Sequence, residues 1–417
     1  MEFVSFLNWI IAILFVACYA YQFFYIFVSL VFKSKKSPDA QPKRYAALIS
    51  ARNEENVIAN LIESIKKQKY PSELLDIYVV ADNCTDSTAQ AARKAGATHV
   101  WERFNNVQVG KGYALEFLFD RLKEENLIEQ YDGYFVFDAD NLLDENYVAE
   151  MNKTFCAGHR VVTSYRNSKN FGSNWISAGY SLWFLREARY LNNARMILGT
   201  SCAISGTGFL VHKDIILRNG GWKHFLLTED IEFTVDNILK GEKIAYCPTA
   251  VFYDEQPVRF LQSWHQRMRW AKGYLQVFRH YGLSLIKGST VGHNFSCFDM
   301  MMSIMPAIVL TMLSFVLNFS VSLWSILTFN GQVTVVLFSL LESLVNAYGL
   351  LFFLGGITLL TEWKNIYCST PRKILSAFTF PLFMFTYIPI SAVALFKKVE
   401  WKPIQHGVSK KLDDIRA

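Results

Sequence analysis

The chain has 417 residues, of which 52% are hydrophobic and 19% are charged, and its 42 Lys and Arg residues exceed its 36 Asp and Glu residues by 6. This composition excludes a disordered chain, and the length is sufficient for a large folded core. The seven cysteines show no CxxC or metal-finger spacing, which argues against a disulfide-stapled scaffold, and the small positive charge does not indicate a nucleic-acid partner.

The N-terminal residues form a candidate membrane anchor. Residues 3–32 are an apolar and aromatic run, and about 20 such residues suffice to cross a bilayer core. The run lacks the basic start and the small-residue cleavage site of a signal peptide, so we expect a retained anchor over residues 1–32. Five basic residues between positions 33 and 44 follow it directly, and by the positive-inside rule they place the next segment in the cytoplasm.

Residues 45–290 change in character and predict a soluble α/β domain. Short apolar runs alternate with segments of helical spacing, a pattern that indicates βαβ units and a parallel sheet with its ligand at the carboxyl ends of the strands. The expected strands are Tyr45–Ser50, Leu75–Ala81, Thr98–Glu102 and Tyr134–Asp138, and the expected helices are Glu54–Gln68, Ser87–Ala95 and Lys111–Lys123.

A membrane region is expected over residues 298–397, followed by a basic tail over 398–417. Its three apolar runs, at about 300–329, 333–361 and 374–396, are each long enough to cross a bilayer. Three crossings after a cytoplasmic domain would place the tail outside, yet the tail is rich in lysine. Either one run lies along the interface or the tail departs from the rule. We favour a cytoplasmic tail, with Pro381 and Pro389 marking the last run as irregular.

One acidic residue, Glu342, lies inside the second of these runs. A charged group at that depth either lines a polar channel or pairs with another helix. The sequence does not decide between the two.

The strongest chemical signal is Asp138-Ala139-Asp140, at the end of a predicted strand. Two carboxylates separated by one residue at a strand tip can reach a divalent cation and the phosphates of a nucleotide together. Mg²⁺ and Mn²⁺ favour such oxygen ligands. Because a solvated turn explains most isolated triplets of this kind, the assignment depends on the neighbouring strand ends.

Polar turns also follow two other predicted strands. Asp82 begins one of them, and Ser50–Glu55 forms the other. The three turns share one edge of the expected sheet, which is where an α/β sheet binds its ligand. Nearby, Gly110-Lys111-Gly112 is either an ordinary turn or a basic loop that approaches a diphosphate.

Two later segments add a candidate base and a candidate stacking face. Thr228-Glu229-Asp230 precedes a helical stretch, where an acid could deprotonate a hydroxyl nucleophile or where Thr228 simply caps the helix. Gln266-Arg267-Met268-Arg269-Trp270 offers guanidinium groups suited to a diphosphate and an indole suited to a sugar ring. A basic amphipathic interfacial helix is the competing interpretation, and both can hold together.

Taken in order, Asp82, Asp138-Ala139-Asp140, Thr228-Glu229-Asp230 and Gln266-x-x-Arg269-Trp270 resemble the D, DxD, TED and QxxRW signature of membrane-integrated family-2 glycosyltransferases. That family includes cellulose, chitin, hyaluronan and poly-N-acetylglucosamine synthases. The resemblance covers about residues 45–280. It implies an α/β fold of the Rossmann-like GT-A type for the cytoplasmic domain, with flanking transmembrane helices, and inverting transfer from a UDP-sugar.

The resemblance also implies roles for individual residues. Nucleotide-sugar binding falls to Ala51, Arg52, Asn53, Glu54, Asp82, Lys111, Asp138, Asp140, Gln266 and Arg269, with Asp140 as a ligand of Mg²⁺ or Mn²⁺. Asp230 is the expected general base. Acceptor binding falls to Gly206, Thr207, Gly208, Glu229 and Trp270. Trp401-Lys402-Pro403-Ile404 is similar to a gating loop that closes over the nucleotide in hyaluronan synthases.

From this signature we expect a processive β-glycosyltransferase of the cell membrane. It would polymerise UDP-glucose or UDP-N-acetylglucosamine into a capsule or exopolysaccharide and secrete the growing polysaccharide through its own channel. Two alternatives stay open. One is transfer of a single sugar to a membrane lipid, and the other is a catalytically inactive membrane scaffold or transporter.

Overall fold

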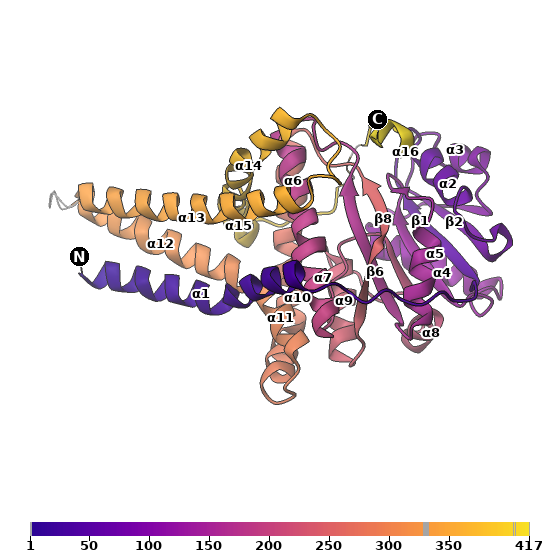
Figure 1. Cartoon of the computed structure of the whole chain (residues 1–417), viewed down its shortest axis with the longest axis horizontal. Coiled ribbons are helices and arrows are strands. Elements are labelled where there is room, and N and C mark those ends of the chain that lie inside the picture. The colour runs from indigo at the N-terminus through magenta and orange to yellow at the C-terminus, as the bar shows by residue number, and fades with distance from the viewer. Residues whose placement is uncertain (1, 328–332, 403, 405, 417) are drawn as a thin grey trace.

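The computed structural model describes residues 2–327, 333–402, 404 and 406–416 (Figure 1). Its centre is an eight-stranded mixed sheet with the strand order β3-β2-β1-β4-β7-β6-β8-β5. The strands are β1 Tyr45–Ala51, β2 Leu75–Asp82, β3 His99–Arg103, β4 Gly133–Asp138, β5 Leu142–Leu143, β6 Val161–Ser168, β7 Phe209–His212 and β8 Ile244–Asp254.

The half of the sheet that the sequence predicts is confirmed. Strands β1 to β4 lie where we expected them, and all three pairings among them are parallel. The prediction of a wholly parallel sheet is wrong, because β7 runs antiparallel to both β4 and β6, and β5 runs antiparallel to β8. The reason is local. The segment before β7 lies at the carboxyl end of β4, where Gly208 donates its N–H to the carbonyl of Val136, so β7 starts there and runs back.

Helices cover both faces of the sheet. On β1, Ala46 and Leu48 point into one core while Tyr45, Ala47 and Ile49 point into the other, as strand alternation requires. The first core is covered by α4 Lys111–Glu124, α6 Trp175–Arg186, α8 Lys213–Asn219 and α9 Glu229–Leu239. The second is covered by α2 Ile58–Lys66, α3 Thr88–Ala95 and α5 Tyr147–Cys156. A short 3₁₀ turn, η1, spans Ser72–Leu74.

Long apolar helices extend from one side of this domain. In Figure 1, α1 (Glu2–Val31), α12 (Pro306–Leu327) and α13 (Val333–Thr361) lie side by side and point away from the sheet. Among the described residues, three helical segments are long and apolar enough to cross a membrane: Phe6–Val31, Leu341–Thr361 and Thr370–Phe396. The run predicted at 300–329 is broken, because Pro306 separates α11 (Phe295–Ile304) from α12, and residues 328 and 329 lie outside the described part.

The last apolar run bends and packs on the α/β domain. It consists of α14 (Thr370–Phe385) and α15 (Tyr387–Phe396), with a break at Thr386. Buried Arg267, on the long helix α10 (Phe260–Thr290), donates hydrogen bonds to the carbonyl of Phe383 at 3.1 Å and to the hydroxyl of Thr386 at 2.6 Å. This clamp holds the break against the domain, as expected for an irregular segment.

A buried ion pair joins helix α1 to the α/β domain. Arg195, on α7 (Asn193–Leu198), makes two bonds of 2.7 and 2.8 Å to Asp299 on α11. The hydroxyls of Tyr21 and Tyr25 on α1 donate to the same carboxylate at 2.9 and 2.8 Å. Because these groups are removed from water, the cluster fixes how α1 meets α7 and α11.

The C-terminal tail returns to the α/β domain. Arg416, in the short helix α16 (Leu412–Arg416), pairs with Asp144, and Lys411 lies 3.8 Å from Glu63. The hydroxyl of Ser409 accepts a hydrogen bond of 2.9 Å from Asn60. The tail therefore lies on the same side of the apolar helices as the sheet.

Candidate active site

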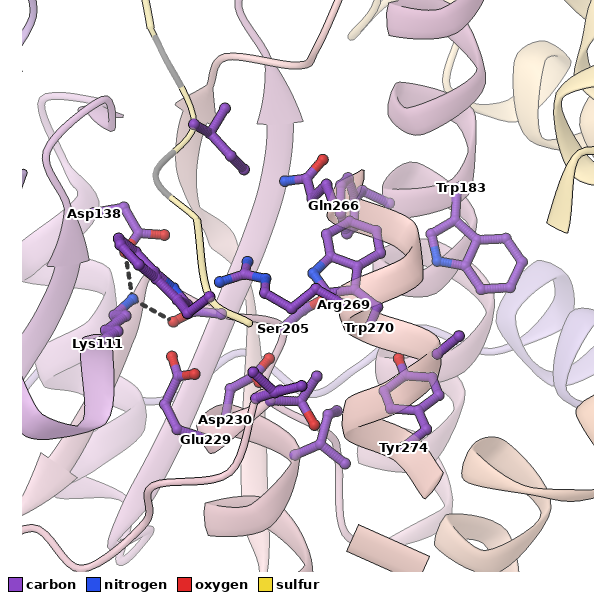
Figure 2. A pocket seen from close by; sticks show the side chains of 18 of the residues that line it. Lys111, Asp138, Trp183, Ser205, Glu229, Asp230, Gln266, Arg269, Trp270 and Tyr274 are labelled. Atoms are coloured by element: carbon purple, nitrogen blue, oxygen red, sulfur yellow. Dashed lines mark hydrogen bonds and ion pairs between the residues drawn. The ribbon is translucent and has the colours of Figure 1, made fainter. Parts of the chain in front are cut away.

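A single large cavity of about 560 Å³ lies at the carboxyl edge of the parallel strands and continues toward the apolar helices. Twelve of the sixteen site residues expected from the sequence line it: Ala51, Arg52, Glu54, Asp82, Lys111, Asp138, Gly206, Glu229, Asp230, Gln266, Arg269 and Trp270. Figure 2 shows Lys111 and Asp138 at one end, Glu229 and Asp230 below, and Arg269 and Trp270 facing them. Residues that are far apart in the sequence thus share one space.

Four expected residues do not line the cavity. Asn53 joins two turns, since its side chain accepts a hydrogen bond of 2.8 Å from the backbone of Thr85. The buried Thr207 hydroxyl accepts from the backbone N–H of Asp138 at 2.8 Å and so supports the acidic turn from behind. Gly208 lies against the ring of Phe252, which leaves no room for a side chain. Asp140, the fourth, is described below.

Lys111 connects the acidic turn to the Gly206 loop. Its ammonium pairs with the Asp138 carboxylate and donates a hydrogen bond of 2.8 Å to the carbonyl of Gly206 (Figure 2). Lys111 is the first residue of α4, which begins at the cavity. A cation in this position can neutralise a phosphate that enters beside Asp138.

Asp82 is held rigidly at the end of β2. Its carboxylate accepts a hydrogen bond of 2.6 Å from Arg103, the last residue of β3, and both side chains are buried. Because the ion pair uses one carboxylate oxygen, the other can accept a donor from a ligand. The geometry is that of a fixed acceptor at the cavity wall.

Glu229 and Asp230 start helix α9 at the floor of the cavity. Burial raises the pKa of Asp230, while hydrogen bonds from the backbone of Ile231 and Gly206 and the charge of Lys111 oppose that rise. Burial and the charge of Asp230 raise the pKa of Glu229 to about 7. The start of a helix stabilises negative charge, so the half-buried Asp230 can stay ionised. A partly desolvated carboxylate with a raised pKa is suited to accept a proton.

Helix α10 presents the QxxRW residues on one face. Gln266, Trp270 and Tyr274 are spaced by four residues, and all three line the cavity together with Arg269. The helix packs closely on the Thr228 turn, where a side chain at Gly273 would meet Thr228 at 2.5 Å. Glycine at 273 thus allows the base and the stacking residues to face one another.

Several buried polar atoms at the cavity have no hydrogen-bond partner among the described residues. They are Nη1 of Arg52, Oε2 of Glu54, Oγ1 of Thr228 and Oε1 of Gln266. An unpaired buried polar atom is costly, and native proteins pair nearly all of them. These atoms therefore mark positions where a polar ligand would make bonds.

The residues fit a divalent cation that is shared with a ligand. Asp138 borders the cavity, and Asp140 lies behind it, accepting a bond of 2.7 Å from the backbone of Glu255. Among the described residues, no group of three or more His, Cys, Asp or Glu side chains is arranged to hold a metal. A cation here would need phosphate oxygens to complete its coordination, as Mg²⁺ and Mn²⁺ commonly do.

The tail contributes to the part of the cavity that Arg52 and Glu54 line. Arg52 lies 5.2 Å from the ring centroid of Trp401, and His406 pairs with Glu54 at 2.8 Å. Burial alone would lower the pKa of His406, but the charges of Asp140 and Glu54 raise it to about 10. Trp401, Lys402, Ile404 and His406 line the cavity, while Pro403 of the expected gating loop lies outside the described residues. The gating role stays a prediction.

Sequence reasoning missed a wall of the cavity on α6. Trp183, Phe184 and Glu187 line it, and Glu187 opens the π-helical turn η2 (Glu187–Asn192) that follows α6. Arg166, on β6, also lines the cavity and donates a bond of 2.9 Å to the carbonyl of Ser205. The uniformly apolar segment of α6 carries no motif, so nothing in the sequence singles these residues out.

The amino-acid sequence also matches a protein family and several known proteins. A family model described as glycosyltransferase like family 2 matches residues 42–273. The chain is 28% identical over 251 residues to the probable glycosyltransferase YdaM of Bacillus subtilis (strain 168), covering 55% of each chain.

Two other relatives carry more specific names. The match to the beta-monoglucosyldiacylglycerol synthase of Nostoc sp. (strain PCC 7120) is 27% identical and covers 58% of this chain and 51% of that one. The match to the poly-beta-1,6-N-acetyl-D-glucosamine synthase of Staphylococcus epidermidis is 25% identical and covers 64% of each. The chain therefore spans about half to two thirds of the length of these relatives.

A solved structure supports the fold over nearly the whole chain. The mannosyltransferase PcManGT from Pyrobaculum calidifontis, in complex with GDP-Man and Mn²⁺, aligns with a TM-score of 0.56 at 16% identity. The alignment covers 93% of this chain and 98% of that one, so it includes the flanking helices as well as the GT-A domain.

Proposed function

The chain belongs to glycosyltransferase like family 2, and from this premise we propose that it transfers a hexose from a UDP-sugar to an acceptor hydroxyl with inversion at the anomeric carbon. The observation that carries the proposal is the meeting of Asp230 with Lys111, Asp138 and Arg269 in one cavity. A base, a cation for phosphate and a diphosphate-binding guanidinium are the groups that such a displacement needs.

In the proposed reaction the acceptor oxygen attacks the anomeric carbon of the donor. The bond from that carbon to the β-phosphate oxygen breaks, and its electron pair leaves with UDP. Asp230 takes the proton of the acceptor hydroxyl, while Lys111, Gln266 and Arg269 stabilise the charge that develops on the diphosphate. A divalent cation held by Asp138 and Asp140 would neutralise part of the same charge when bound.

Support for the donor site comes from the unpaired atoms around it. Nη1 of Arg52 and Oε1 of Gln266 are buried without partners among the described residues, and both residues line the same cavity as Asp138. We propose that Ala51, Glu54 and Asp82 bind the uridine, following the resemblance stated above. A screen of UDP-sugars for UDP release identifies the hexose, with UDP-glucose and UDP-N-acetylglucosamine tested first.

The acceptor is proposed to be a hydroxyl presented at the membrane. The signature predicts a growing polysaccharide that leaves through the protein's own channel, and one relative is named as a polysaccharide synthase. Another relative is named as a glucosyldiacylglycerol synthase, which adds one sugar to a lipid. Incubation with radiolabelled UDP-sugar separates the two, because only processive transfer yields a long product that glycosidases degrade.

The decisive test of the chemistry is the Asp230→Asn variant. We expect it to lower the rate of UDP release by about 10²–10⁴-fold, since the amide cannot accept the acceptor proton. Asp236→Asn on the same helix is the matched control, because Asp236 pairs with Lys240 and lies outside the cavity. Equal rates in the two variants would remove Asp230 from the mechanism. If the wild type releases no UDP from any UDP-sugar, the inactive-scaffold alternative replaces this proposal.

A further inference from the structure

The cavity has two ends of different chemistry. Its donor end is lined by charged side chains, including Asp82, Lys111 and Arg269. Its other end is lined by Phe15 of α1, Ala347 and Leu351 of α13, Met384 of α14 and Ile388 of α15. Phe15, Ala347 and Leu351 belong to Phe6–Val31 and Leu341–Thr361, two segments long and apolar enough to cross a membrane, while Met384 and Ile388 belong to the apolar segment Thr370–Phe396. The cavity therefore extends from a polar site toward the apolar helices.

The apolar end suits hydrocarbon better than sugar. Ser391 on α15 offers one hydroxyl there, but most hydroxyls of a sugar chain placed at this end would lose water without gaining a partner, at a cost of about 1–3 kcal/mol per unpaired group. Acyl chains lose nothing by the same transfer. The acidic residue of α13, Glu342, does not supply a polar lining, because it is exposed on the outer surface of the helix and does not border the cavity.

Glu187 lies where the two ends meet. It borders the cavity four residues after Trp183 and directly follows α6, so the two side chains project from the same side of this continuous helical segment. Its carboxylate accepts a hydrogen bond of 3.2 Å from Ser205, and its charge acts on both Asp230 and Tyr274. In Figure 2, Trp183 and Tyr274 lie on the side of Asp230 that faces away from Lys111 and Asp138. Glu187 thus faces the space that an acceptor hydroxyl must occupy to reach the base.

The local backbone at Glu187 is unusual. The residue opens a π-helical turn, a wider form that occurs mostly as single turns at functional sites. Burial raises the pKa of Glu187, and the charges of Arg166 and Arg195 oppose that rise. The mechanism proposed above gives this half-buried carboxylate no task.

We propose that the acceptor is a membrane lipid with a hydroxylated headgroup, that Glu187 accepts a hydrogen bond from this headgroup beside Asp230, and that the acyl chains occupy the cavity between α1, α13 and α15. The inference rests on the proposed function, since the reacting bonds and the proton transfer to Asp230 are the same. It adds the class of acceptor, the residue that holds it and the direction from which it enters.

The first test uses the full chain in phosphatidylcholine vesicles with radiolabelled UDP-sugar and 1,2-dioleoylglycerol as the lipid probe. The expected result is labelled material in the organic phase, with glycerol alone giving no labelled product. Labelled long polymer in the aqueous phase, or UDP release without labelled lipid, overturns the inference and leaves the proposed function standing. Absence of UDP release from every UDP-sugar overturns the proposed function instead.

The second test fills the apolar end. Leu351→Trp should lower the use of dioleoylglycerol relative to dibutyroylglycerol by about tenfold or more, because the indole occupies space that only long chains need. Leu350→Trp is the matched control, since Leu350 is the neighbouring residue on α13, is exposed and does not border the cavity. The ratio of the two acceptors is measured within one preparation, so partial misfolding cancels. Equal ratios in both variants contradict the inference.

The third test addresses Glu187 directly. Glu187→Gln should raise the KM for the lipid acceptor by about tenfold, the loss expected for a hydrogen bond to a charged group, with the KM for the UDP-sugar changed less than about twofold. A variant that lowers kcat and shifts both KM values equally would show a structural role only and would remove Glu187 from the acceptor site.

Discussion

Glu229 and Asp230 are adjacent carboxylates with different tasks in the proposed mechanism. Glu229 is buried and Asp230 is half-buried at the start of α9, and loss of hydration raises the pKa of each. Asp230 acts as a base only when it is ionised, so activity must rise with pH as its proton is lost. Because the two groups interact, the acid side of the pH profile reports the pair rather than either residue alone.

This arrangement predicts the pH dependence of kcat/KM. We expect activity to fall as the pH drops through about 7, the value to which the pKa of Glu229 is raised, and to continue falling as Asp230 is protonated. Glu229→Gln removes the group that titrates near neutral pH, so the fall should begin at lower pH in that variant. The measurement is UDP release across pH 4–9 in the presence of acceptor. An acid side that is the same in wild type and Glu229→Gln excludes a contribution of Glu229.

At this scale the sequence predicted residues that belong to motifs and missed residues that do not. Asp82, Asp138 and Asp230 lie at strand ends or at a helix start, and Arg269 belongs to the QxxRW spacing within α10, so residue type and spacing carry information. Glu187 directly follows α6 outside any motif, and the nearby Trp183 and Phe184 are more simply explained as core. Only the position of α6 beside the cavity gives them significance.

Among the elements, the contact of α1 with α7 and α11 depends on a buried ion pair. Asp299 accepts four hydrogen bonds, two from Arg195 and one each from Tyr21 and Tyr25. Removing one partner of a buried pair leaves an uncompensated charge, which costs about 3–5 kcal/mol. Asp299 is therefore a stability residue for the attachment of the anchor, although it lies far from the reacting groups.

The Asp299→Asn variant should consequently lower the melting temperature of the full chain in detergent markedly. Its matched control is Glu102→Gln, which breaks the exposed pair with Arg93 and should cost about 1 kcal/mol or less. Thermal unfolding followed by circular dichroism compares the two variants. Similar melting temperatures would show that the buried pair contributes little to the attachment of α1.

The helices and strands were predictable where the apolar residues follow a regular pattern. The alternation of short apolar runs and helical segments gave β1 to β4 nearly to the residue, because buried parallel strands need such runs. The antiparallel β7 could not be predicted, since its four residues follow a loop whose course is set by contacts with Asp138 and Asn141 through Thr207. The break between α14 and α15 was indicated by its prolines, while the Arg267 clamp was not.

For the whole molecule, the sequence left a conflict over the side of the membrane on which the tail lies. Three crossings after the domain would place the tail outside, whereas its lysines favour the inside, and the contacts of the tail suggest a solution. The tail packs on the catalytic domain through Asn60, Asp144 and Glu255. We infer that α1, α12 and α13 cross the membrane and that α14 and α15 lie at its surface on the domain side. With an even number of crossings after the domain, the tail and the domain would lie on the same side of the membrane, as the lysines of the tail favour by the positive-inside rule. The side-chain amides of Asn8 and Asn318 exchange hydrogen bonds of 2.9 and 3.0 Å that join α1 to α12, as interhelical hydrogen bonds do in membranes.

This arrangement predicts which positions are accessible from outside the cell. In a background whose native cysteines are replaced by alanine, Glu2→Cys should react with a membrane-impermeant maleimide in intact cells. Asp413→Cys in the tail and Glu73→Cys in the catalytic domain are both exposed on the protein and should react only after the membrane is opened. If Asp413→Cys reacts in intact cells while Glu73→Cys does not, the Thr370–Phe396 segment crosses the membrane. The tail could then not contact Asn60, Asp144 and Glu255 in the membrane-bound protein, because the tail and the sheet would lie on opposite sides of the membrane.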